Sequence, residues 1–135
     1  MVAYNFQARF MALIRDGRKL QTIRGDRALY GRHARPGDRL QLYCGQRTGG
    51  CFMIVPPPLC VMVLPIRISF ASGSIERIAT GGVRVRDLDM FAALDGFEDL
   101  AGMSAFWREH HGAADFNGVV IEWAMPRKLA EREAA

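Results

Sequence analysis

Two parts of the sequence carry apolar residues at the spacing of an amphipathic helix. In the first part, the apolar residues are Phe6, Phe10, Leu13 and Ile14, and Gly17 follows as a helix stop signal. The second part follows Arg86, is interrupted at Asp95-Gly96, and has its apolar residues at Leu88, Phe91, Ala92, Leu100, Met103, Phe106 and Trp107. These patterns predict one helix near the N-terminus and two short helices after residue 86, capped at Asp87 and at Glu98 or Asp99.

Between and after these two helical segments, apolar and polar residues alternate and β-branched residues are frequent, as is typical of strands. We expect strands at 20–24, 39–44, 52–55, 60–70 and 116–124, and a further short strand or a pair of strands over 75–78 and 83–85. Pro65 interrupts the fourth of them and therefore predicts a bulge or an edge at that point. The resulting order predicts an α+β fold, a small, strongly curved or closed antiparallel sheet flanked by short helices, because open short strands would leave exposed edges.

The length of 135 residues fits one domain, which we place at residues 1–125 with a charged C-terminal tail at 126–135. The longest apolar run is shorter than the roughly 20 residues that cross a bilayer. The first ten residues lack the pattern of a secretory signal. We therefore expect no membrane association and a cytoplasmic location.

Charge is distributed unevenly along the chain. Residues 1–47 hold ten basic and three acidic residues, a balance of +7, and residues 48–135 hold eight basic and eleven acidic residues, a balance of −3. Such an excess is typical of a surface that binds an anion, with nucleic acid the commonest partner. A solvated basic face without a ligand accounts for the same composition.

The cysteines and histidines do not follow a metal-binding pattern. The cysteine spacing C-x6-C-x8-C matches no common zinc motif, and adjacent histidines on a helix point about 100° apart. An odd cysteine count also argues against a disulfide framework. We expect reduced, buried thiols and neither a metal nor another cofactor; the residues concerned are Cys44, Cys51, Cys60, His33, His110 and His111.

The stretch GRKLQTIR at 17–24 combines an amine, a hydroxyl and a guanidinium. A strand over 20–24 places Thr22 and Arg24 on one face, and Lys19 in the preceding turn can reach the Thr22 hydroxyl. Lysine acts as a base only if burial or neighbouring cations, here Arg18 and Arg24, lower its pKa from about 10.4. The alternative is a charged surface turn beside an ordinary strand threonine.

The same stretch belongs to a longer resemblance. The run Phe10-x-x-x-Ile14-x-x-Gly17-x-Lys19-x-x-Thr22-Ile23-Arg24, followed by Pro36-Gly37-Asp38-x-Leu40-x-Leu42-Tyr43, closely resembles the ASCH domain family. Two further segments, Tyr43 to Cys51 and Asp87 to Phe97, resemble a branch of that family found in bacteria and phages. The resemblance covers residues 6–124 and implies a PUA-like β-barrel.

The resemblance also implies two kinds of activity. ASCH domains are generally proposed to bind RNA or other nucleic acid, and one small bacterial branch hydrolyses the amide of N4-acetylcytidine. Lys19 matches the activating lysine of that branch and Thr22 its nucleophile, while Asp95 stands where the branch has glutamate. The other expected ligand contacts are Arg18, Arg24, Tyr43 and Arg47, the last in a Gly45–Gly50 insertion that the compact amidohydrolases lack.

Two hypotheses follow for the function. In the first, a basic cleft containing these residues binds RNA, a nucleotide or a nucleoside, with Tyr30 and Tyr43 as candidate stacking surfaces. In the second, Thr22 attacks an amide carbon of a modified nucleoside, Lys19 takes its proton and Asp95 moves or positions a proton. A cleft that contains Lys19 hydrogen-bonded to Thr22 favours the second hypothesis, whereas a broad basic groove favours the first. Trp107 and Trp123 are expected in the core.

Overall fold

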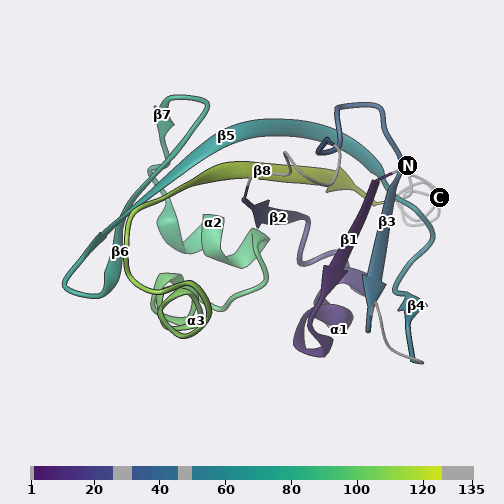
Figure 1. Ribbon diagram of the computed structural model, residues 1–135, viewed down its shortest axis with the longest axis horizontal. Helices are drawn as coiled ribbons and strands as arrows, with labels where there is room; N and C mark the ends of the chain where they lie inside the picture. The colour runs from purple at the N-terminus through teal and green to yellow at the C-terminus, as the bar shows by residue number, and fades with distance from the viewer. Residues whose placement is uncertain (1, 26–31, 46–49, 126–135) are drawn as a thin grey trace, which may run out of the picture.

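The computed structural model describes residues 2–25, 32–45 and 50–125 (Figure 1). The elements in chain order are β1 (Val2–Phe6), the 3-10 turn η1 (Ala8–Phe10), α1 (Met11–Arg15), β2 (Gln21–Arg24), β3 (Leu40–Cys44), β4 (Phe52–Met53), β5 (Leu59–Ala71), β6 (Ser74–Thr80), β7 (Val83–Arg84), α2 (Leu88–Leu94), α3 (Leu100–His111) and β8 (Phe116–Ala124). The expected charged tail at 126–135 lies outside the described residues.

The fold is α+β, as predicted, with mostly antiparallel strands arranged in two sheets. The smaller sheet has the order β1-β3-β4, with β1 and β3 parallel, and the larger sheet has the order β2-β8-β5-β6-β7. A bridge between Arg39 and Leu59 connects the two sheets where β3 begins and β5 enters the larger sheet. Within the described ranges the ladders form these two sheets and show no closed barrel.

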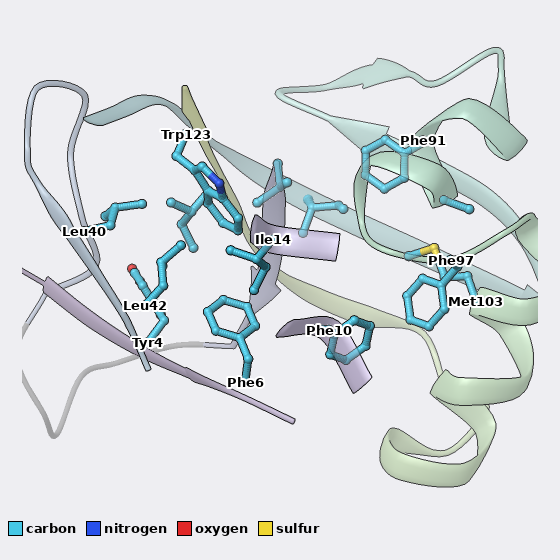
Figure 2. Close-up of a cluster of buried hydrophobic side chains, with 14 of the residues drawn as sticks. Tyr4, Phe6, Phe10, Ile14, Leu40, Leu42, Phe91, Phe97, Met103 and Trp123 are labelled. Atoms are coloured by element: carbon cyan, nitrogen blue, oxygen red, sulfur yellow. The ribbon is translucent and has the colours of Figure 1, made fainter. Parts of the chain in front are cut away.

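The core runs between the two sheets and continues under the helices (Figure 2). Figure 2 shows Trp123 beside Leu40 and Leu42 at one end, and Phe97 beside Met103 at the other. Side chains from the N-terminal segment lie between these groups and join them. The expected burial of Trp107 and Trp123 is confirmed, since both are less than 5% exposed.

The N-terminal helix is shorter than predicted, because Phe6 belongs to a strand. Tyr4 and Phe6 are buried on either side of exposed Asn5, which is the alternation of a strand rather than of a helix. Strand β1 lies along β3 in parallel register, and the helical segment begins only at Ala8. Phe10 and Ile14 still point into the core as the helical pattern predicts.

The remaining strands follow the sequence pattern with two corrections. Strand β4 is shorter than the predicted 52–55 and ends at Met53, although the N–H of buried Ile54 still donates to the Leu42 carbonyl at 2.8 Å. Strand β5 passes through Pro65, and its irregularities lie between Cys60 and Met62 and between Ser69 and Phe70. Pro65 is paired with Val119 of β8, but the pairing of β5 with β6 begins only at the next residue, Ile66. The expected edge is therefore found only on the β6 side of β5.

Helices α2 and α3 both begin at predicted caps. The Asp87 side chain accepts a hydrogen bond from the Met90 N–H, and the Asp99 side chain accepts one from the Gly102 N–H, each at 2.9 Å. The prediction of buried thiols is wrong for Cys51, which is exposed because it precedes the exposed edge strand β4. Cys44 and Cys60 are buried, and all three thiols are free.

Candidate functional site

A cavity of about 590 Å³ opens between the N-terminal segment, β2 and α3. Its polar lining comes from Asn5, Gln7, Lys19, Thr22, Arg24 and Asp95. Its aromatic and imidazole lining comes from Phe6, Phe10, Phe97, Phe106, Trp107, Phe116, His110 and His111. The three residues predicted as catalytic, Lys19, Thr22 and Asp95, therefore meet at one cavity, although Asp95 lies far along the sequence from the other two.

The turn after α1 directs Lys19 into the protein. Gly17 adopts a positive φ of 75°, and the N–H groups of Arg18 and Lys19 both donate to the Leu13 carbonyl at 2.9 and 3.0 Å. The Leu20 N–H then donates to the Leu94 carbonyl at 3.0 Å, which fixes the chain against the end of α2. Lys19 is only 3% exposed, so the alternative of a charged surface turn is wrong at this residue.

The Lys19 amine is held by oxygen atoms and aromatic rings. Its Nζ donates to the backbone carbonyl of Gln21 at 2.8 Å and to that of Asp95 at 2.6 Å. It lies 3.7 Å from Asp95 Oδ1, too far for a hydrogen bond, and 4.9 Å from the Phe10 ring centroid. An ammonium group has three N–H donors, so one of them lacks a hydrogen-bond acceptor among the described residues.

Asp95 is placed by the C-terminal turn of α2. The helix ends there because Gly96 adopts a φ of 99°, a conformation that favours glycine. A Cβ at Gly96 would lie 2.9 Å from Phe10 Cδ1 and 3.0 Å from Lys19 Cδ, so a side chain there would push against the site. The buried Asp95 carboxyl accepts a long hydrogen bond of 3.4 Å from Gln21 Nε2.

Burial changes the ionisation of this pair in opposite directions. Desolvation lowers the pKa of Lys19 from 10.5 to about 8, opposed by the nearby Asp95 and assisted by Arg24. Desolvation also raises the pKa of Asp95 above 3.8, against the attraction of Lys19. Both shifts favour the neutral forms, and shifted pairs of this kind are concentrated at functional sites. Arg24, not Arg18, is the cation that contributes to the Lys19 shift.

Thr22 interacts with Arg24 rather than with Lys19. Arg24 Nε donates to Thr22 Oγ1 at 3.1 Å, and its terminal nitrogen donates to the Asn5 carbonyl at 2.8 Å. The guanidinium also lies 5.0 Å from the Phe6 ring centroid. No hydrogen bond joins Lys19 and Thr22, and the Thr22 hydroxyl hydrogen has no acceptor among the residues that the structure describes.

Two other predicted ligand contacts, Arg18 and Tyr43, do not line the cavity. Arg18 is exposed, pairs with Asp16 at 2.9 Å and does not line the cavity. Tyr43 is half-buried on β3 and also lies away from the cavity lining. Arg47 and Tyr30 lie outside the described residues.

The sequence analysis missed the polar and aromatic surroundings of the site. Gln21 is 2% exposed and contacts both members of the Lys19–Asp95 pair, yet nothing distinguished it from an ordinary strand residue. His110 and His111 line the cavity from the end of α3, and each packs at a tilt against an aromatic ring. The helical spacing of Phe10 and Ile14 predicted that both are buried, but it did not predict that Phe10 forms part of the cavity wall.

Within residues 2–25, 32–45 and 50–125, no three His, Cys, Asp or Glu side chains cluster as candidate metal ligands. In the same ranges, every helix is too short or too polar to cross a membrane.

Comparisons of the chain with known protein families, with characterised proteins and with solved structures find no match.

Proposed function

We propose that this chain is a PUA-like ASCH domain protein whose cavity binds one nucleoside or nucleotide, either free or as a unit of RNA. The observation that carries the proposal is the convergence of Lys19, Thr22 and Asp95 on one cavity. Its volume of about 590 Å³ is in the range of small-molecule sites. The curved, mostly antiparallel sheets with short helices are compatible with a PUA-like architecture.

The walls and floor of the cavity suit different parts of such a ligand. Aromatic rings such as Phe97 and Phe106 offer faces or edges to a base, which binds by stacking. The Thr22 hydroxyl can donate to an oxygen or nitrogen acceptor, and so can the third N–H of Lys19 below its pKa of about 8, where the amine is an ammonium group. Among the described residues, the lysine and arginine side chains that line the cavity are Lys19 and Arg24, and so few cations favour one bound unit over a long strand in a basic groove.

Titration calorimetry with nucleosides, nucleoside monophosphates and short RNA oligonucleotides at low salt tests the proposal. Thr22→Val removes one hydroxyl and should weaken binding about 5- to 10-fold, the value of one hydrogen bond. Thr80→Val is the matched control, because Thr80 is half-buried on β6 and does not line the cavity. Absence of binding by the wild-type protein to every ligand tested contradicts the proposal.

A second candidate function is hydrolysis of an N-acylated nucleoside such as N4-acetylcytidine. The specific support is the lowered pKa of Lys19 in the same cavity as the Thr22 hydroxyl. Thr22 Oγ1 would bond to the acyl carbon and the C–N bond would break. The hydroxyl proton would pass through Lys19 to the leaving nitrogen, and water would then cleave the acyl-threonine ester. Water or a rotation of the amine has to complete the path, since Lys19 and Thr22 are not hydrogen-bonded.

Acetate release from N4-acetylcytidine over time tests this activity. A base with a pKa of about 8 has to be neutral to accept a proton, so the rate should increase as pH rises through 8. Thr22→Val should abolish release and Thr80→Val should retain it. If the wild-type protein binds the nucleoside but releases no acetate, the binding function stands and this reaction is excluded.

A further inference from the structure

The larger sheet presents three arginines on the face that the helices do not cover. Figure 1 shows α2 and α3 on one side of the curved sheet formed by β5, β6 and β8. Ile66 and Ile68 of β5 are buried, whereas Arg67 between them is exposed and therefore lies on the opposite face. Arg77 on β6 and Arg84 on β7 are also exposed.

The strand register brings these three side chains together. Arg67 lies opposite Ala79, and Ala79 lies opposite Arg84, so all three side chains share one face of the sheet. Arg77 is two residues from Ala79 and is a diagonal neighbour of both other arginines, at about 7–8 Å. We call Arg67, Arg77 and Arg84 the arginine face.

The arginine face has no ionic partner within the chain as described. None of its three members forms an ion pair or a side-chain hydrogen bond with any residue in the described ranges. Glu76 is exposed beside Arg77 in the sequence but does not pair with it. Clustered like charges on a sheet destabilise it, so an anionic partner would stabilise this arrangement.

We propose that the arginine face binds the phosphate backbone of a nucleic acid, at a surface separate from the cavity. Guanidinium groups match phosphate in charge and in hydrogen-bond geometry. At about 7–8 Å, neighbouring arginines of this face are close enough for their long side chains to contact phosphates of the same strand. The face contains small or polar neighbours, Ser69, Ala79 and Asn117, and lacks the aromatic anchors of a lipid-binding surface.

The arginine face and the cavity lie on opposite sides of the sheet. Phe116 lines the cavity and is paired with buried Ile68, so the cavity is on the helix-covered side. None of the three arginines lines it. The inference therefore does not require the cavity to bind any ligand, and a nucleic acid bound on this face would not block the cavity.

Salt-dependent binding of a single-stranded RNA oligonucleotide tests the inference. The variant is Arg67→Gln/Arg77→Gln/Arg84→Gln, which removes three exposed charges without opening the core. Each phosphate contact contributes about 0.7 to the slope of log affinity against log salt, so the slope should fall by about 2. From about 50 to 200 mM salt, the wild-type affinity should therefore fall about 20-fold more than that of the variant.

The matched control is Arg15→Gln/Arg35→Gln/Arg39→Gln, which removes three exposed charges from the N-terminal third. It should keep most of the salt slope if the arginine face is the binding surface. The inference is overturned if the two triple variants lose affinity equally, if the arginine-face variant binds like the wild type, or if the wild type binds anionic vesicles but no RNA. Nucleoside binding to the cavity, measured separately with Thr22→Val, should be unchanged in the arginine-face variant.

Discussion

The buried Lys19 amine should make the stability of this protein increase with pH in the alkaline range. Burial favours the neutral amine, so the folded protein loses the Lys19 proton at a lower pH than the unfolded chain does. Between pH 8 and 10.5, the unfolded chain holds a proton that the folded protein has released. Stability therefore rises with pH across this window, and the cost of burying the ammonium is fully present below it.

The size of the effect follows from the two pKa values. The interval from about 8 to 10.5 corresponds to about 3 kcal/mol in the free energy of unfolding. Cys60 opposes this trend. Burial raises the pKa of its thiol, so the folded protein becomes less stable as pH rises and the thiol ionises more readily in the unfolded chain. A comparison with a variant that lacks only the amine isolates the contribution of Lys19.

The assay is urea unfolding of the wild-type protein and of Lys19→Met, followed by tryptophan fluorescence across pH 8 to 10.5. The difference between their unfolding free energies should change by about 3 kcal/mol in favour of the wild type as pH rises. If Lys19→Met does not fold, Lys19→Met/Asp95→Asn replaces it, because the double substitution leaves no uncompensated charge.

A direct titration gives the decisive check. The chain contains two lysines, so NMR of isotope-labelled lysine Cε atoms gives two resonances, and the one absent from the variant belongs to Lys19. It should titrate near pH 8. Parallel pH dependence of the two proteins, together with a Lys19 titration near 10.5, would refute the reasoning.

Three further predictions concern the elements that build the site. Gly96→Ala should cost about 3 kcal/mol in urea unfolding because it combines a positive φ with contact against Phe10 and Lys19. Gly37→Ala has a similar φ of 97° with open space around it and should cost only about 1 kcal/mol; equal losses would exclude the steric explanation. Asp99→Ala should lower stability by about 1 kcal/mol through loss of the α3 cap, whereas Asp99→Asn should retain most of it. Ser104→Ala should cost about 1–3 kcal/mol, measured in the same way, because the buried Ile75 N–H loses its acceptor; a neutral effect would mean that water replaces the hydroxyl.

The sequence predicted individual helices and strands best where a short stretch of residues is enough to determine the local structure. The alternation of Leu40, Leu42 and Cys44 predicted strand β3 and its buried face. Asp87 and Asp99 predicted two helix starts because capping needs only a side chain and the next few N–H groups. Phe6 was assigned to a helix because it continues the helical spacing of the apolar residues that follow it. The same spacing also fits a strand followed by a shorter helix, and only the pairing of β1 with β3 decides between the two.

The sequence analysis named three residues that meet at the cavity, Lys19, Thr22 and Asp95, but neither their contacts nor the rest of the lining. The motif around GRKLQTIR drew attention to Lys19 and Thr22, and the Asp95-Gly96 turn supplied the carboxylate. Their actual partners are the Gln21 and Asp95 carbonyls and the Arg24 guanidinium. A backbone carbonyl has no sequence signature, so no reading of side-chain types could have identified the acceptors that hold the Lys19 amine.

By itself, the sequence determined the succession of helices and strands, the caps and turns, and which residues are chemically capable of forming a site. Only the tertiary structure decided that Lys19 is buried, that Asp95 folds back to it, and that three arginines from separate strands share one sheet face. The physical reason is that capping and amphipathic periodicity act over a few residues, whereas desolvation and strand register depend on segments far apart in the chain.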